Sequence, residues 1–148
     1  MRAVIQRAKE ANVRVENEIV GEINRGLVVF IGVEDDDGEE DINYLVRKIS
    51  NLRIFEDEED KMNLSVKDVD GAILSISQFT LHADTKKGNR PSFVAAAKPD
   101  YADKVYNQFN ELLSEQGLRV ETGEFGKHME IDFINDGPVT ILIDSKNK

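Results

Sequence analysis

The chain has 148 residues, no Cys, 19 Lys plus Arg against 29 Asp plus Glu, and a formal net charge of -10. At this length the chain is most simply one domain, which buries about 68–70% of its unfolded surface and needs no covalent staple. The lack of Cys excludes disulfides, thiolate nucleophiles and Cys-ligated metals. No apolar run approaches the roughly 18 residues of a membrane span, so we expect a cytoplasmic protein without a membrane partner.

The negative charge is concentrated in two segments. Residues 34–41 hold seven acids and residues 56–60 hold five, with no Lys or Arg in either, so the rest of the chain is slightly positive. We expect both segments to be solvated loops or helix starts. In contrast, residues 85–99 hold four cations and no acid, and Lys86, Lys87 and Arg90 among them are candidate contacts to RNA phosphates.

The first half of the chain reads as short strands followed by a helix. Residues 2–7, 12–16, 19–23 and 27–33 have the composition and alternation of strands, with a turn at 16–18. An amphipathic helix follows, because apolar residues recur at i, i+3, i+4 and i+7, at Ile42, Leu45, Val46 and Ile49.

The second half repeats the mixture. A strand is expected at 72–79 and three more at 118–122, 129–134 and 139–144. Between them, a helix begins near Pro99 and ends at Gly117. Its apolar face is formed by Ala102, Val105, Tyr106, Phe109, Leu112 and Leu113. We find no linker or repeat and predict an α+β fold, a single compact domain (1–148) in which two amphipathic helices pack on a strongly bent, antiparallel-rich sheet or barrel.

The sequence is poor in catalytic groups. It has no nucleophile elbow, phosphate-binding loop or dinucleotide fingerprint, and only His82 and His128 are candidate bases at neutral pH. His82 and Asp84 would supply two metal ligands where a catalytic zinc takes three, so we expect no metal and no cofactor. Thr80 is a weak nucleophile because no base is apparent for it.

Two short runs stand out. Residues 77–81 read Ser-Gln-Phe-Thr-Leu at the end of a strand, and residues 135–140 read Asn-Asp-Gly-Pro-Val-Thr. Gly137 is free to adopt unusual dihedral angles, and Pro138 makes a cis bond accessible and removes a donor. The second run is interpreted either as a hairpin turn before the last strand or as part of a substrate pocket walled by main chain.

Together with five further segments, these runs resemble the D-aminoacyl-tRNA (D-tyrosyl-tRNA) deacylase family in order and spacing. Those segments are Met1–Arg7, Asn51–Glu56, Lys61–Ser65, Lys87–Phe93 and Thr122–Gly126. His82 departs from the pattern, in which Tyr is expected. The resemblance implies a homodimer that hydrolyses the ester of D-aminoacyl-tRNA as chiral proofreading, and also removes mischarged glycine, with no DNA partner.

The resemblance also assigns roles to residues. Ser77, Gln78 and Thr80 line the pocket. We expect the backbone N–H groups of Phe79 and Thr80 to stabilise an oxyanion there while the tRNA 2′-hydroxyl assists the chemistry. A cis Gly137-Pro138 pair, braced by Arg7, enters the partner's site and excludes L side chains.

The resemblance further implies that Phe125 and Met129 lie against the terminal adenine. As alternatives, these two are ordinary core residues and Arg7 is a surface strand cation. Two other functions stay open for the whole chain. One is a non-catalytic tRNA- or RNA-binding module, and the other is an acidic scaffolding protein.

Overall fold

The computed structural model describes residues 1–148, beginning with two long strands. β1 (Arg2–Val15) and β2 (Glu18–Gly32) form an antiparallel hairpin closed by Glu16 and Asn17, both at positive φ, which confirms the predicted turn. The four short strands predicted here are instead two long ones. Exposed Lys9 and Glu10 interrupt the apolar alternation, but pairing continues past them because main-chain hydrogen bonds do not depend on side-chain polarity.

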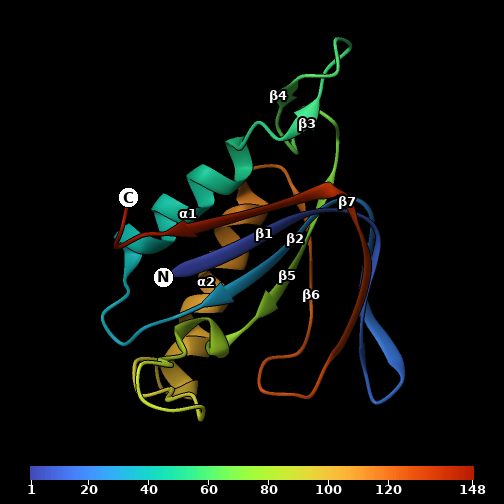
Figure 1. Cartoon of the computed structure of the whole chain (residues 1–148). Coiled ribbons are helices and arrows are strands. Elements are labelled where there is room, and N and C mark those ends of the chain that lie inside the picture. The colour runs from blue at the N-terminus through green and yellow to red at the C-terminus, as the bar shows by residue number, and fades with distance from the viewer.

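The sheet has five strands in the order β6-β5-β2-β1-β7 (Figure 1). β5 (Ala72–Ser77) is parallel to β2, β6 (Arg119–Thr122) is parallel to β5, and β7 (Glu130–Asp144) is antiparallel to β1. β6 and β7 each pair with one neighbour only, so the sheet is open, and of the expected sheet or barrel the structure has the sheet. The parallel pairs are joined by crossovers that contain the two helices, as parallel pairing requires.

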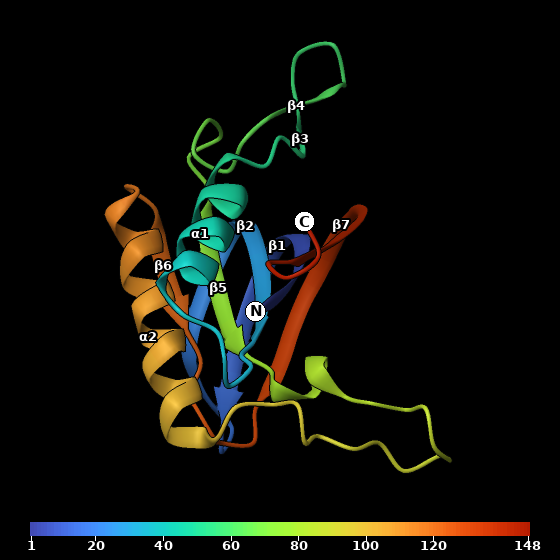
Figure 2. The same cartoon turned by 90° about the vertical axis from the view of Figure 1, so that its left-hand side faces the viewer.

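Both helices cover one face of this sheet (Figure 2). α1 (Glu39–Asn51) buries the predicted apolar face, and α2 (Pro99–Glu115) buries its own except for half-buried Leu112. A smaller apolar cluster lies apart from this core and includes Val13, Leu74 and Ile76. The α+β fold with two amphipathic helices is confirmed, and no helix has the length and apolar composition to cross a membrane.

The two acidic segments differ in burial. Residues 56–60 are largely exposed, beside a small sheet of β3 (Phe55–Glu56) and β4 (Met62–Leu64) that the sequence did not indicate. Within 34–41, however, Asp37 and Asp41 are buried, so the expected solvation is wrong for these two. Asp37 accepts a hydrogen bond from the Met1 α-amino group at 2.7 Å, and Asp41 accepts one from Ser145 Oγ at 2.7 Å.

The run at 135–140 is not a hairpin turn. β7 continues through it in one direction, pairing Asn135 with Ala8 and Thr140 with Gln6 on the same strand β1. Residues 136–139 therefore bulge out opposite the single residue Arg7. The Gly137-Pro138 bond is cis, and Gly137 has φ +139°. A bulge of this kind redirects the backbone without ending the strand.

Candidate functional site

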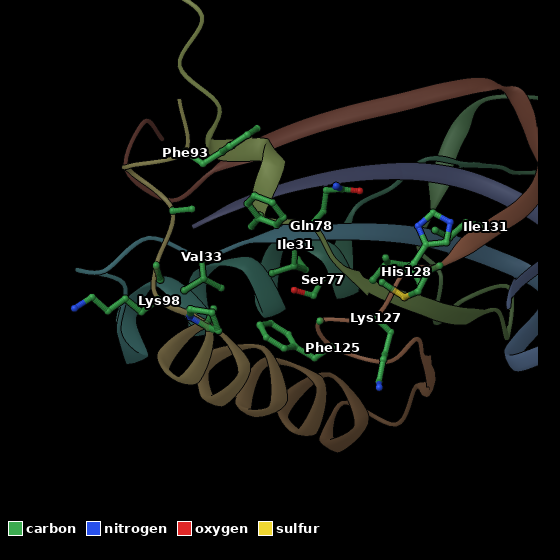
Figure 3. A pocket seen from close by; sticks show the side chains of 18 residues that line it. Ile31, Val33, Ser77, Gln78, Phe93, Lys98, Phe125, Lys127, His128 and Ile131 are labelled. Carbon is green, nitrogen blue, oxygen red and sulfur yellow. The ribbon is translucent and has the colours of Figure 1, made fainter. Parts of the chain in front are cut away.

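A cavity of about 630 Å³ lies where β5 ends, bounded by the start of α2 and the segment between β6 and β7 (Figure 3). Its volume is in the range of small-molecule sites. Ile31, Val33, Ala97 and Ala102 give it an apolar lining that the motif analysis did not identify. In the sequence these four residues have the same pattern as ordinary core residues. Only the tertiary structure shows that they lie together around a cavity.

The Ser77–Thr80 run forms the wall where β5 changes into a short helix. Ser77 is the last β5 residue, paired with Ile31, and the next residue donates its backbone N–H to Ile31 O at 2.8 Å. The 3-10 helix η1 (Phe79–His82) then begins, and its first internal bond runs from Leu81 N–H to Gln78 O. The N–H groups of Phe79 and Thr80 precede that bond and have no acceptor within the helix.

Side chains of this run are only partly inside the cavity. Those of Ser77, Gln78 and Phe79 line it, whereas Thr80 does not. Thr80 is exposed, and its Oγ1 accepts a hydrogen bond from Gln78 Nε2 at 2.5 Å. This hydrogen bond has Thr80 Oγ1 as its acceptor, so it withdraws no proton from the hydroxyl and does not activate it as a nucleophile.

Phe125 and Met129 line the cavity from the segment between β6 and β7. The Phe125 ring lies 6.3 Å from the Tyr106 ring, and the Tyr106 hydroxyl donates to Ser75 O at 2.7 Å, which joins α2 to β5 behind the site. Burial raises the pKa of Tyr106, so it stays a neutral donor. Met129 approaches Gly123 so closely that a Cβ there would lie 2.5 Å from its Sδ.

Three polar side chains surround this apolar space. Lys98, Lys127 and His128 line the cavity, and both lysine side chains extend away from its centre (Figure 3). Of the two candidate bases, the structure places His128 here, whereas His82 is buried elsewhere with its Nδ1 3.2 Å from Glu34 Oε1. The sequence indicated no role for Lys127, since an isolated exposed Lys carries no pattern.

Arg7, Gly137 and Pro138 come together outside this cavity. Arg7 is buried, and its Nε donates to Asp136 O at 2.9 Å while its Nη1 donates to Ile54 O and to Glu56 Oε2, both at 2.8 Å. The bond from Arg7 lowers the pKa of the Glu56 carboxyl. None of the three lines the cavity of its own chain.

Lys86, Lys87 and Arg90 are exposed on the long loop between η1 and α2, which projects from the body of the molecule (Figure 2). They do not line the cavity, but Phe79 of the preceding η1 does, and so do Phe93 and Lys98 of the loop itself. A positively charged loop therefore lies next to the opening of the cavity.

The carboxylates of Glu34, Asp36 and Asp37 lie within 4.8 Å of one another and form the one cluster with the composition of a metal site. Asp37 is already paired with the Met1 amino group, and Lys146 Nζ lies 3.6 Å from Asp37 and 3.2 Å from Asp41. These cations account for the cluster as a structural ion-pair network.

Comparison with known proteins gives consistent matches. A family model described as D-Tyr-tRNA(Tyr) deacylase matches residues 4–144. Proteins named D-aminoacyl-tRNA deacylase from Bacillus thuringiensis (strain Al Hakam) and Bacillus anthracis (strain CDC 684 / NRRL 3495) are each 58% identical to this chain. Each alignment spans 146 residues, 99% of this chain and 100% of the relative.

Two solved structures are also similar. One, called c-Myc DNA Unwinding Element Binding Protein, has a TM-score of 0.91 and 41% identity over 97% of this chain and 98% of its own. The other, described as a probable eukaryotic D-amino acid tRNA deacylase, has a TM-score of 0.83 over 96% and 97%. At 19% identity it shows the shared fold alone.

Proposed function

This chain belongs to the D-Tyr-tRNA(Tyr) deacylase family, and on that premise we propose that it hydrolyses the ester bond of D-aminoacyl-tRNA. The reaction releases the D-amino acid and free tRNA as chiral proofreading during translation, and a cytoplasmic location is proposed with it. Glycine carried on the wrong tRNA is a second substrate. No cofactor is required, because water is the only other reactant.

The observation that carries this proposal is the pair of N–H groups at Phe79 and Thr80, which lack helix acceptors beside a cavity with an apolar wall. When water attacks the ester carbonyl carbon, the carbonyl oxygen becomes an oxyanion that these donors stabilise. Losing one such donor costs about 2.7–4 kcal/mol of transition-state stabilisation.

The substrate supplies the rest of the chemistry. The vicinal 2′-hydroxyl passes the proton of the attacking water to the ribose oxygen that leaves as the C–O bond breaks. The protein holds the ester, the hydroxyl and the water in register, with the adenine against Phe125 and Met129 and the ester beside Ser77 and Gln78. This division of labour fits the exposed, unactivated Thr80 hydroxyl.

We further propose that chiral selection comes from a second copy of the chain. The bulge at Gly137-Pro138 lies outside its own cavity, on the edge strand β7, so it has to reach a cavity from another subunit. β7 also exposes Ile134 (46%) and Leu142 (67%), which favours association along this edge. A two-fold dimer then has two equivalent sites. A steric wall rejects L side chains but admits glycine.

The defining experiment measures hydrolysis of D-Tyr-tRNA, L-Tyr-tRNA and Gly-tRNA, with sedimentation of the protein and binding of uncharged tRNA beside it. We expect a dimer that hydrolyses the D-Tyr and Gly esters and spares the L-Tyr ester. Binding of tRNA without hydrolysis would indicate a non-catalytic RNA-binding module, and neither activity a scaffolding protein. A DNA oligonucleotide belongs in the binding test because the structural neighbour at 41% identity is named for DNA binding.

Complementation tests the shared site. A Cβ at Gly137 would lie 2.8 Å from Val139 Cγ2 at an unfavourable positive φ, so Gly137→Ala should distort the bulge that excludes L side chains. Phe125→Arg should fill the cavity. Refolding the two variants together gives half heterodimers, each with one intact site, so about a quarter of all sites should again hydrolyse the D ester while rejecting the L ester. Gly38→Ala, where a Cβ meets nothing within 4 Å, is the control. No recovery would exclude a site shared across subunits.

A further inference from the structure

Two aromatic rings at the cavity mouth are left exposed. Phe79 is 55% exposed and Phe93 is 36% exposed, although both line the cavity. Their ring centroids lie 5.1 Å apart at 71°, so they form an edge-to-face pair. Packing of the core does not explain side chains this open to solvent. The pair presents exposed apolar ring surface at the mouth of the cavity that is assigned to the terminal adenosine.

The chain between these two residues carries the positive charge of this region. Lys86, Lys87 and Arg90 lie on it, and no acid occurs in residues 85–99. An aromatic surface beside cations is the combination by which proteins bind single-stranded nucleic acid, since bases stack on the rings while the backbone meets the charges.

We propose that the Phe79–Phe93 pair stacks the base of the nucleotide that precedes the terminal adenosine of the tRNA 3′ end. This inference rests on the proposed function. The terminal adenine is assigned to Phe125 and Met129, which line the same cavity from a different segment, so the two last bases contact different side chains. The phosphate between them passes the cavity mouth, where Lys98 and Lys127 lie.

Phe79 links this second base site to the chemistry. Its ring belongs to the aromatic pair, and its backbone N–H is one of the two proposed oxyanion donors. A base stacked on the ring therefore holds η1 in the position that the transition state needs. In this way binding energy from a nucleotide that does not react is used at the reacting carbonyl.

The test compares two substrates, D-tyrosyl-tRNA and D-tyrosyl-adenosine, which lacks the preceding nucleotide. Phe93→Ala should lower kcat/KM for the tRNA about 10- to 100-fold more than for the adenosine ester, the range expected for loss of one stacked base. Phe93→Tyr keeps a ring and should restore most of the difference. Val94→Ala is the control, because Val94 is 88% exposed next to the pair and does not line the cavity. Equal losses on both substrates would overturn the assignment.

A spectroscopic measurement reports stacking directly. With 2-aminopurine in place of the penultimate base of uncharged tRNA, binding to wild-type protein should quench the fluorescence, and Phe93→Ala should abolish the quenching. Unchanged quenching in Phe93→Ala would overturn the proposal, as would a change in sedimentation, which would assign Phe93 to a subunit interface. If wild-type protein hydrolyses neither D ester, the proposed function itself fails. If it hydrolyses both but Phe93→Ala affects them equally, only this inference fails.

Discussion

Replacing Arg7 by Ala should separate the bulge from the strand that supports it. Arg7 reaches from β1 to the bulge, and its guanidinium donates hydrogen bonds to Ile54 O, Glu56 and Asp136 O. Removing it leaves one well-buried carbonyl without a donor and frees the residue directly before Gly137. We therefore expect a loss of both stability and chiral discrimination.

The magnitude follows from the exposure of the three partners. Ile54 is buried, so its carbonyl loses a charged hydrogen bond that water does not replace, at about 1.5–3 kcal/mol. Asp136 and Glu56 are exposed, so water substitutes there and the loss is small. With the packing of the Arg7 stem, the free energy of unfolding should fall by about 2–4 kcal/mol. A loss of 3 kcal/mol corresponds to a Tm lower by about 6–12 °C.

Urea denaturation and initial rates on D-Tyr-tRNA and L-Tyr-tRNA, measured below the lowered Tm, test both effects. The D/L rate ratio should fall at least tenfold in Arg7→Ala. Arg7→Lys keeps the charge without the planar fork, so it should recover part of the stability and little of the ratio. Arg14→Ala on the same strand is the control, because Arg14 pairs with Ile19 and Glu130, away from the bulge. An Arg7→Ala protein with unchanged stability and D/L ratio would refute the reasoning.

Three further outcomes are expected. Thr80→Ala should keep substantial hydrolysis of D-Tyr-tRNA, since its hydroxyl is not activated; abolished turnover in a folded, tRNA-binding variant would contradict substrate-assisted catalysis. The combined Lys86→Ala, Lys87→Ala and Arg90→Ala variant should weaken tRNA binding and reduce the slope of log K against log salt by about 2–3, whereas an unchanged slope would place the RNA elsewhere. Partial burial raises the pKa of Asp41, but hydrogen bonds to its carboxylate outweigh burial and lower the pKa to about 2. The ionised carboxylate therefore stabilises the fold fully above pH 3.8, and this stabilisation is lost as the pH falls toward 2. Asp41→Asn should therefore lower the free energy of unfolding at pH 7 and flatten its decline between pH 4 and 2 in urea titrations; a decline as steep as in wild type would show that other groups cause it.

Local pattern was sufficient for much of the fold. The apolar spacing of Ile42, Leu45, Val46 and Ile49 located α1, and Pro99 marked the start of α2, because these signals depend on neighbours within a few residues. Burial of Asp37 and Asp41 was missed for the opposite reason. Their partners Met1 and Ser145 are 36 and 104 residues away, and a run of acids reads as solvated until those partners are known.

The sequence by itself determined the helices, most strand positions, and the two motif segments that resemble a known family. The tertiary structure decided what lies next to what. Asn135 to Thr140 became a bulge because both of its flanks pair with β1, more than 120 residues earlier in the chain. The cavity exists only where β5, α2 and the segment before β7 meet, so Ser77, Phe93 and Phe125 acquire a shared role that no local pattern encodes. Short-range propensities set each element, whereas strand order and cavity position depend on long-range pairing and packing of the whole core.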